Sequence, residues 1–119
     1  VYEGIKISSG NSFVHETESQ VIMNGSYNIN FTMDLVCKDV GLFEKLAQDM
    51  NVPIEVSPLI TKIFKEGREK YGDRAWSSMI VKRLEDACEE DLRAPGYPEE
   101  LVDDTPRRKG YEVIPNNIK

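Results

Sequence analysis

The chain has 119 residues, 39% of them hydrophobic and 30% charged, with a net charge of −6 at pH 7 and a pI of about 4.8. This length predicts one small domain, and the acidic balance argues against nucleic-acid binding, which normally needs a basic face, and against docking on an anionic membrane. No apolar run approaches the roughly 18 residues of a membrane span, and we expect a cytoplasmic protein that contacts neither nucleic acid nor membrane.

The N-terminal quarter predicts two helices. Residues 1–9 carry a short helical pattern that we interpret as the last turns of a longer helix, and Gly10 fits its C-terminal end. Asn11 or Ser12 can cap a second helix that runs to about Met23, because short polar side chains accept hydrogen bonds from the first free N–H groups of a helix.

The longest helix follows a turn and an extended segment. Residues 24–26 have strong turn chemistry, and 27–31 predict a short extended lead. An amphipathic pattern predicts a helix over 32–51. Val52-Pro53 ends it, because the residue before a proline is pushed out of the helical region.

Two further helices are expected before the tail. Ser57-Pro58 supplies an N-cap and a first-turn proline for a helix that Gly72 ends, and Asp73 can cap a last helix over 74–91. The side chains expected to point inward from that last helix are Trp76, Ile80, Leu84, Ala87 and Cys88.

The C-terminal residues have a different composition. Prolines and glycines recur from Arg93 onward and exclude a long helix, so we divide the chain into a helical domain over 1–92 and an extended tail over 93–119. We expect Tyr97 and Tyr111 to anchor this tail.

No residue set predicts catalysis or metal binding. Cys37 and Cys88 fall on separate predicted helices, and we expect small buried thiols without a disulfide. The single histidine, His15, has no nucleophile signature or second metal ligand beside it, so we expect it on the surface of its helix. Nor does the sequence contain a glycine-rich G-x-G-x-x-G turn between a strand and a helix, which a dinucleotide-binding domain needs.

The longest predicted helix has one side chain out of place. At about 100° per residue its apolar and polar side chains separate onto two faces, yet Asp39 falls on the apolar face between Leu46 and Met50. Asp39 therefore has a specific partner, contacts something outside this chain, or lies at the helix edge within reach of water. Lys38 follows Asp34 by four residues, a spacing typical of a solvated surface pair.

The same region carries a family resemblance. Phe31, followed by Lys38-Asp39 and Val40-Gly41-Leu42, resembles the F-x6-K-D-[LV]-x-L signature of the β-hydroxyacid dehydrogenases, such as 3-hydroxyisobutyrate dehydrogenase. Upstream, Ser8-Ser9-Gly10-Asn11-Ser12 resembles the S-G-x-S turn of that family, to which we assign no ligand. Downstream, Asn51-Val52-Pro53-Ile54 resembles its G-x-P-x-P segment with a single proline. The similarity is clearest from about Ser8 to Leu92.

The resemblance implies an all-α fold, a bundle of about four to five helices similar to the C-terminal domain of 6-phosphogluconate dehydrogenase. It implies the C-terminal domain of an NAD(P)-dependent enzyme, a homo-oligomer that converts a small 3-hydroxy acid into a semialdehyde. In that family a separate Rossmann domain holds most of the NAD or NADP, and a long helix between the domains bears the catalytic lysine. The resemblance therefore implies no catalytic residue in this chain, and no cofactor binding or activity of this chain alone.

Three residues acquire a role in cofactor binding by this resemblance. Lys38 reaches across the cleft toward the nicotinamide side, Phe31 packs near the nicotinamide and substrate, and Asp39 supports the site. The chemistry agrees in part, because lysine offers a mobile point charge with three donors and phenylalanine a flat apolar wall.

Two other interpretations stay open. The chain is a stand-alone helical interaction module without catalysis, or it is a purely structural dimerisation domain. In the second case Lys38 and Asp39 form an ordinary surface pair and Phe31 is a core aromatic.

Overall fold

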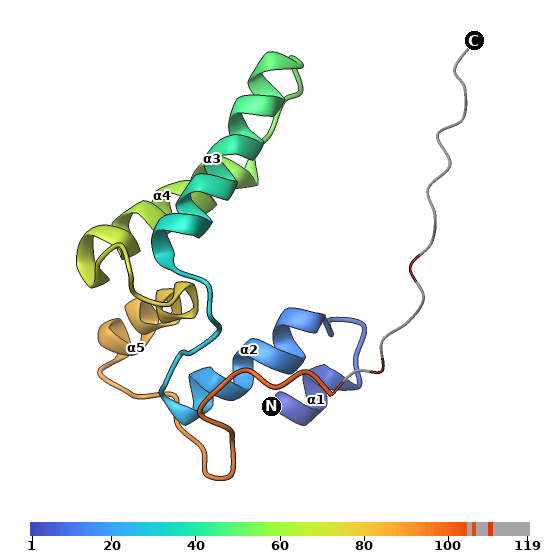
Figure 1. Ribbon diagram of the computed structural model, residues 1–119, viewed down its shortest axis with the longest axis vertical. Coiled ribbons are helices and arrows are strands. Elements are labelled where there is room, and N and C mark those ends of the chain that lie inside the picture. The colour runs from blue at the N-terminus through green and yellow to red at the C-terminus, as the bar shows by residue number, and fades with distance from the viewer. Residues whose placement is uncertain (105, 107–109, 111–119) are drawn as a thin grey trace.

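A computed structural model describes residues 1–104, 106 and 110 of the chain (Figure 1). Over these residues the fold is all-α, as predicted, with five α-helices, one 3-10 helix and no strand beyond two isolated bridges. The elements are α1 (Tyr2–Lys6), α2 (Phe13–Asn24), α3 (Met33–Asp49), α4 (Val56–Tyr71), the 3-10 helix η1 (Ser77–Val81) and α5 (Lys82–Cys88). None of the helices in the described residues is long and apolar enough to span a membrane.

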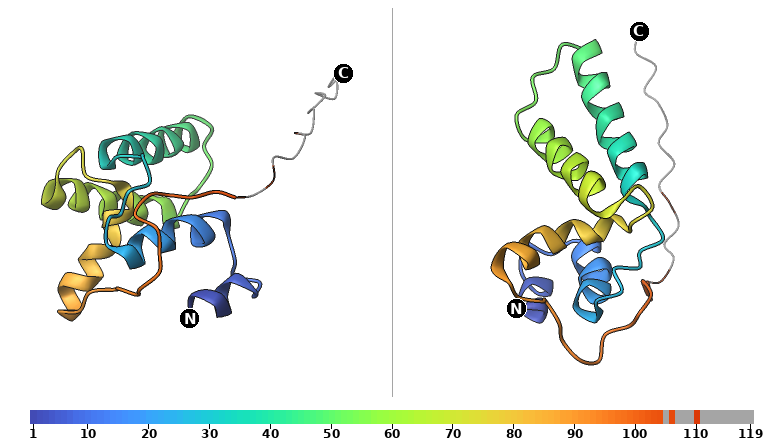
Figure 2. Two further views of the ribbon diagram at one scale, coloured as in Figure 1. Left: turned by 60° about the horizontal axis from the view of Figure 1, so that its bottom comes forward. Right: turned by 90° about the vertical axis from the view of Figure 1, so that its left-hand side faces the viewer.

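The helices form two groups. α3 and α4 lie side by side as an antiparallel hairpin that projects from the rest of the chain, and α1, α2, η1 and α5 make up the base (Figures 1 and 2). The base meets the hairpin mainly where η1 contacts α4.

Local sequence signals set both ends of α2, but α4 begins at Val56 without a side-chain cap, so the prediction that Ser57 caps it is wrong. Ser12 caps α2, since its Oγ accepts a hydrogen bond from the backbone N–H of His15 at 3.0 Å, and Gly25 ends this helix with a φ of 91°. Thr32 precedes α3, whose end at Asp49 lies just before the predicted break at Val52-Pro53. These boundaries confirm the predicted second and third helices to within about two residues.

The predicted last helix is wrong in its first half. Asp73 does not cap a helix, because its carboxylate accepts two hydrogen bonds from Arg68, at 2.7 and 2.9 Å. Trp76 pairs with Thr32 in an antiparallel bridge, and the N–H of Ser77 donates to the carbonyl of Phe31 at 2.8 Å. These contacts with the segment before α3 keep residues 72–76 out of a helix.

The inward face predicted for that helix is also wrong in α5. Leu84 is 64% exposed, and Ala87 and Cys88 are exposed as well, whereas Glu85 is buried. The buried-thiol prediction therefore fails for Cys88 and is confirmed for Cys37.

The core lies where α2, the start of α3, α4 and η1 meet. Val21 and Met33 are its fully buried side chains. A Cβ at Gly67 would lie 2.5 Å from Cδ1 of Ile80, so the absence of a side chain there lets α4 approach η1 closely.

The segment after α5 runs back along α2. The N–H of Ala94 donates to the carbonyl of Met23 at 3.0 Å, and Asn24 Nδ2 donates to the carbonyl of Tyr97 at 3.0 Å. The Tyr97 ring also meets the Tyr2 ring edge-on, with centroids 5.5 Å apart. Tyr97 is thus an anchor, as expected, while Tyr111 lies outside the described residues, and the division at residue 92 stays a prediction.

Candidate functional site

Lys38 and Asp39 lie next to one another on the exposed side of α3. Lys38 Nζ is 2.9 Å from Asp39 Oδ1, and their side chains are 59% and 53% exposed. The face assigned to Asp39 by periodicity is itself uncovered, because Leu46 and Met50 are 61% and 67% exposed. The Asp39 carboxylate is thus not buried: it reaches water, as the helix-edge alternative predicted, and it also pairs with Lys38, so both side chains are accessible to a ligand.

The pairing of Lys38 with Asp34 is not found. Asp34 accepts a hydrogen bond from the hydroxyl of Thr32 and lies 3.4 Å from Arg74. The Thr32 hydroxyl, and then Arg74, hold the pKa of the Asp34 carboxyl below its ordinary value. Lys38 therefore pairs with its neighbour and not with the residue one turn earlier.

Phe31 lines a cavity of about 410 Å³ between α2, α3, α4 and η1. Its half-buried side chain precedes α3. The walls of this cavity are Val14, Glu18, Ser19, Ile22, Phe31, Val36, Phe64, Ser77, Ser78 and Ile80. Neither Lys38 nor Asp39 lines this cavity. The structure therefore pairs Lys38 with Asp39 but does not place Phe31 with them around one cavity.

The sequence interpretation missed one residue of this cavity, Glu18. Burial raises the pKa of its half-buried carboxyl, and within the described residues it has neither a hydrogen bond nor an ion pair. A signal was present, since Glu18 lies midway between Val14 and Ile22 at a spacing of four, on the face of α2 that meets the hairpin.

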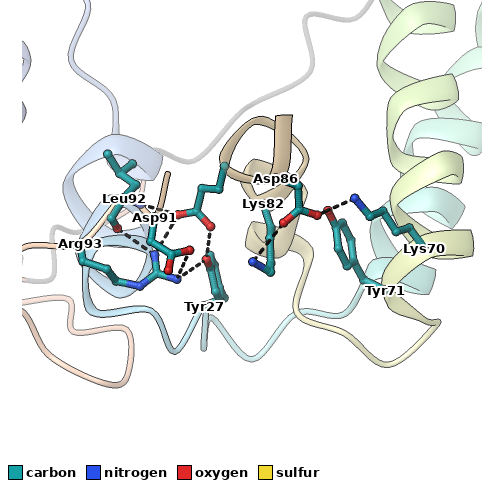
Figure 3. Close-up of polar contacts among 9 residues, drawn as sticks. Tyr27, Lys70, Tyr71, Lys82, Asp86, Asp91, Leu92 and Arg93 are labelled. Carbon is teal, nitrogen blue, oxygen red and sulfur yellow. Dashed lines mark hydrogen bonds and ion pairs between the residues drawn. The ribbon is translucent and has the colours of Figure 1, made fainter. Parts of the chain in front are cut away.

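A second missed carboxylate, that of Glu85, is fully partnered. Its side chain is 4% exposed and accepts hydrogen bonds from the hydroxyl of Tyr27 at 2.5 Å, Arg93 at 2.8 Å and the N–H of Leu92 at 2.9 Å (Figure 3). Burial raises the pKa of this carboxyl, but the three donors outweigh burial and the net shift is downward. The network joins α5 to the segment that follows α2, through Tyr27, and to the segment that follows α5, through Leu92 and Arg93.

A third cluster lies beside it on the surface. Asp86 accepts hydrogen bonds from Lys70 Nζ at 2.5 Å and from the Tyr71 hydroxyl at 3.0 Å, and it lies 3.2 Å from Lys82 Nζ (Figure 3). These donors, Lys70 first, lower the pKa of Asp86 to about 2. The cluster links α5 to α4 and has no free acid or base.

His15 is half-buried instead of lying on the surface. Its ring packs on that of Tyr2 with centroids 4.9 Å apart, and its Nε2 is 3.0 Å from the Tyr2 carbonyl. Its Nδ1 is 3.2 Å from the hydroxyl of Ser19. Since a carbonyl only accepts, Nε2 carries the proton in this arrangement and the ring fixes α1 on α2.

No catalytic constellation is apparent among these residues. Within the described part of the chain, no group of three or more His, Cys, Asp or Glu side chains could hold a metal ion. The positions singled out above offer the exposed ammonium of Lys38, the neighbouring carboxylate of Asp39, and a separate apolar cavity with the carboxylate of Glu18.

Comparison with known proteins gives two matches. The family model described as NAD-binding of NADP-dependent 3-hydroxyisobutyrate dehydrogenase matches residues 1–84. The 2-(hydroxymethyl)glutarate dehydrogenase of Eubacterium barkeri is 36% identical over 76 residues, which are 63% of this chain and 25% of that protein. The match thus spans about a quarter of the relative's length. No solved structure matches the chain.

The family match covers well over half of the chain and includes Phe31, Lys38 and Asp39. Its description assigns the region to NAD binding in an oxidoreductase family, and NAD(P) is the cofactor of that family. The chain belongs to the family of NAD-binding regions of NADP-dependent 3-hydroxyisobutyrate dehydrogenase.

Proposed function

We propose that this chain is the C-terminal helical domain of an NAD(P)-dependent β-hydroxyacid dehydrogenase. The enzyme would oxidise a small 3-hydroxy acid to a semialdehyde, or reduce the aldehyde. The observation that carries this proposal is the family match over residues 1–84, which covers every helix from α1 to η1. The similarity to a hydroxymethyl-substituted acid dehydrogenase agrees with it.

Lys38, Asp39 and Phe31 are the residues that we propose to contact the cofactor. Lys38 Nζ is exposed and held by a single neighbour, so it can exchange Asp39 for a polar group of NAD(P) at little cost. Phe31 would offer an apolar wall to the nicotinamide, and Asp39 would orient Lys38. The described residues contain no glycine-rich phosphate cradle, so the pyrophosphate would be held by another domain. A bound NAD(P) would supply the hydride acceptor for oxidation of the alcohol carbon.

The reading frame upstream of Val1 tests this proposal directly. We expect it to encode a G-x-G-x-x-G strand–turn–helix and a G-x-x-x-K helix, and we expect the whole protein to reduce NAD or NADP with a 3-hydroxy acid. A start codon within a few residues of Val1 would leave this chain without the catalytic lysine and would contradict the assignment.

A stand-alone interaction module is the second candidate, and one observation favours it. The hairpin exposes eight large apolar side chains along α3, α4 and the loop between them. They are Leu42, Phe43, Leu46, Met50, Val52, Val56, Leu59 and Ile60. Such patches on soluble proteins mark surfaces that another chain covers. The same reading frame separates the two candidates, because an interaction module needs no upstream dinucleotide-binding domain.

Under either candidate we propose that the exposed hairpin surface holds two copies of the chain together. We expect the chain to sediment as a dimer, and we expect Leu46→Glu to shift it to a monomer, because a charge in a desolvated apolar contact is costly. Gln48→Glu is the matched control, since this exposed residue of the same helix lies on the polar face and gains the same charge. Sedimentation-velocity ultracentrifugation makes the measurement, and a monomeric wild-type chain would refute the proposed interface.

A further inference from the structure

The cavity lined by Phe31 contains one ionisable side chain. Glu18 enters it from α2, Phe64 lines it from α4, and Ser77 and Ser78 line it from η1. At about 410 Å³ it falls within the usual size range of small-molecule sites. No lysine or arginine lines it, so the described residues that form the cavity provide no counter-ion for the carboxylate.

Glu85 shows how this same chain accommodates a carboxylate that it buries for structural reasons. Tyr27, Arg93 and the Leu92 N–H supply three donors to Glu85. Glu18 is half-buried against apolar walls and has none of these. An ionised carboxylate held partly out of water without a partner destabilises the fold, and residues that do so are typical of binding sites.

We propose that this cavity binds a small organic cation, an ammonium group on a compact apolar body, with Glu18 as its counter-ion. The ring faces of Phe31 and Phe64 attract cations when they lie within about 6 Å of the charge. The hydroxyl of Ser78 donates to the carbonyl of Tyr27 at 2.7 Å, and that of Ser19 lies 3.2 Å from His15 Nδ1. Ser77 is therefore the lining hydroxyl available to a polar group of the ligand. The net charge of −6 also favours the approach of a cation.

This site is distinct from the proposed cofactor site of Lys38, Asp39 and Phe31, with which it shares only Phe31. A cation at Glu18 requires neither Lys38 nor a dinucleotide-binding domain. The failure of one proposal therefore leaves the other in place.

The probe is choline, and its neutral isostere 3,3-dimethylbutan-1-ol is the ligand control. Both are titrated into the 119-residue chain at pH 7 and followed by the backbone amide shifts of α2 and η1. We expect choline to bind in the millimolar range or tighter and the alcohol to bind at least roughly tenfold more weakly. Only choline carries a positive charge that can act as the counter-ion of Glu18.

Glu18→Gln is the decisive variant and Glu16→Gln its matched control. Both remove one negative charge from α2, but Glu16 accepts a hydrogen bond from Asn11 and does not line this cavity. We expect Glu18→Gln to weaken choline binding at least roughly tenfold and Glu16→Gln to leave it unchanged. Equal binding of choline and the alcohol, an unchanged affinity in Glu18→Gln, or no shifts up to roughly 10 mM choline would each overturn the proposal.

Thermal unfolding gives an independent measurement without ligand. The pKa of Glu18 is raised in the folded chain, so the group favours folding at pH values where it is protonated and loses that contribution as the pH rises through its folded pKa. We expect Glu18→Gln to melt at a higher temperature than the wild type at pH 7, with the difference vanishing toward pH 4. A lower melting temperature at pH 7 would mean that the carboxylate has a stabilising partner and would overturn the proposal.

Discussion

Arg93→Ala will lower the free energy of unfolding by about 3 kcal/mol, because it leaves the buried carboxylate of Glu85 without its cationic partner. The pair is desolvated on the Glu85 side, where the side chain is 4% exposed, and the remaining donors are the Tyr27 hydroxyl and one backbone N–H. Arg93 also fills the space beside Gly25, where its Nε lies 2.5 Å from the position of a Cβ. Urea unfolding followed by circular dichroism measures the loss.

Arg83→Ala is the control for this prediction. Arg83 lies 3.5 Å from Glu66, whose side chain is 47% exposed, and surface pairs of this kind contribute less than about 1 kcal/mol. Equal losses of stability in Arg93→Ala and Arg83→Ala would show that the network around Glu85 is not a desolvated one.

The pKa of Glu85 is lowered in the folded chain, so the stabilisation from its ionised form is present above its unfolded pKa and is lost as the pH falls. We therefore expect Glu85→Gln to destabilise the chain at pH 7 and to have a smaller effect at acidic pH.

Lys38→Ala will weaken cofactor affinity or turnover at least roughly tenfold in the dehydrogenase that we propose to carry this domain. The ammonium is the only cation in direct contact with Asp39 among the described residues, and it is free to reach a ligand because it is 59% exposed. Loss of one charge-assisted hydrogen bond to a bound cofactor is of this size. The measurement is kcat and KM for NAD(P) in the whole enzyme.

Lys45→Ala is its matched control. Lys45 lies on the same helix, is 69% exposed and pairs with Asp49 at 3.0 Å, as Lys38 pairs with Asp39. Both variants remove one surface ion pair of α3, so a structural effect would appear in both. Unchanged kinetics in Lys38→Ala would remove this residue from the site, and equal losses in the two variants would mean that α3 acts only through its stability.

The apolar face of α3 is only partly covered within the hairpin. The pattern placed Asp39 on an apolar face between Leu46 and Met50 and left open whether this chain covers that face. In the structure α4 covers only part of α3, around Ala47, and leaves Leu46 and Met50 exposed. Periodicity identifies an apolar face but carries no information on whether the same chain covers it.

The 3-10 helix η1 explains the incorrect inward face of α5. Each of its residues turns the chain by about 120° where an α-helix turns it by about 100°. Over Ser77–Val81 the difference adds up to about 100°, so the face extrapolated from Trp76 does not continue to Leu84. Glu85 is buried instead because Tyr27, 58 residues before it, and Arg93, eight residues after it, supply donors.

The sequence by itself determined the all-α class and the family resemblance. It also determined the ends of α2 and α3, because caps, glycine turns and proline breaks act over a few residues. The tertiary structure alone decided the fate of the side chains between those ends. It placed His15 against Tyr2, Glu85 within a ring of donors, and Glu18 in a cavity where it has no hydrogen-bond partner among the described residues. Whether a polar side chain is solvated, paired or left alone depends on the segments that the fold brings to it, and spacing along the chain does not contain that information.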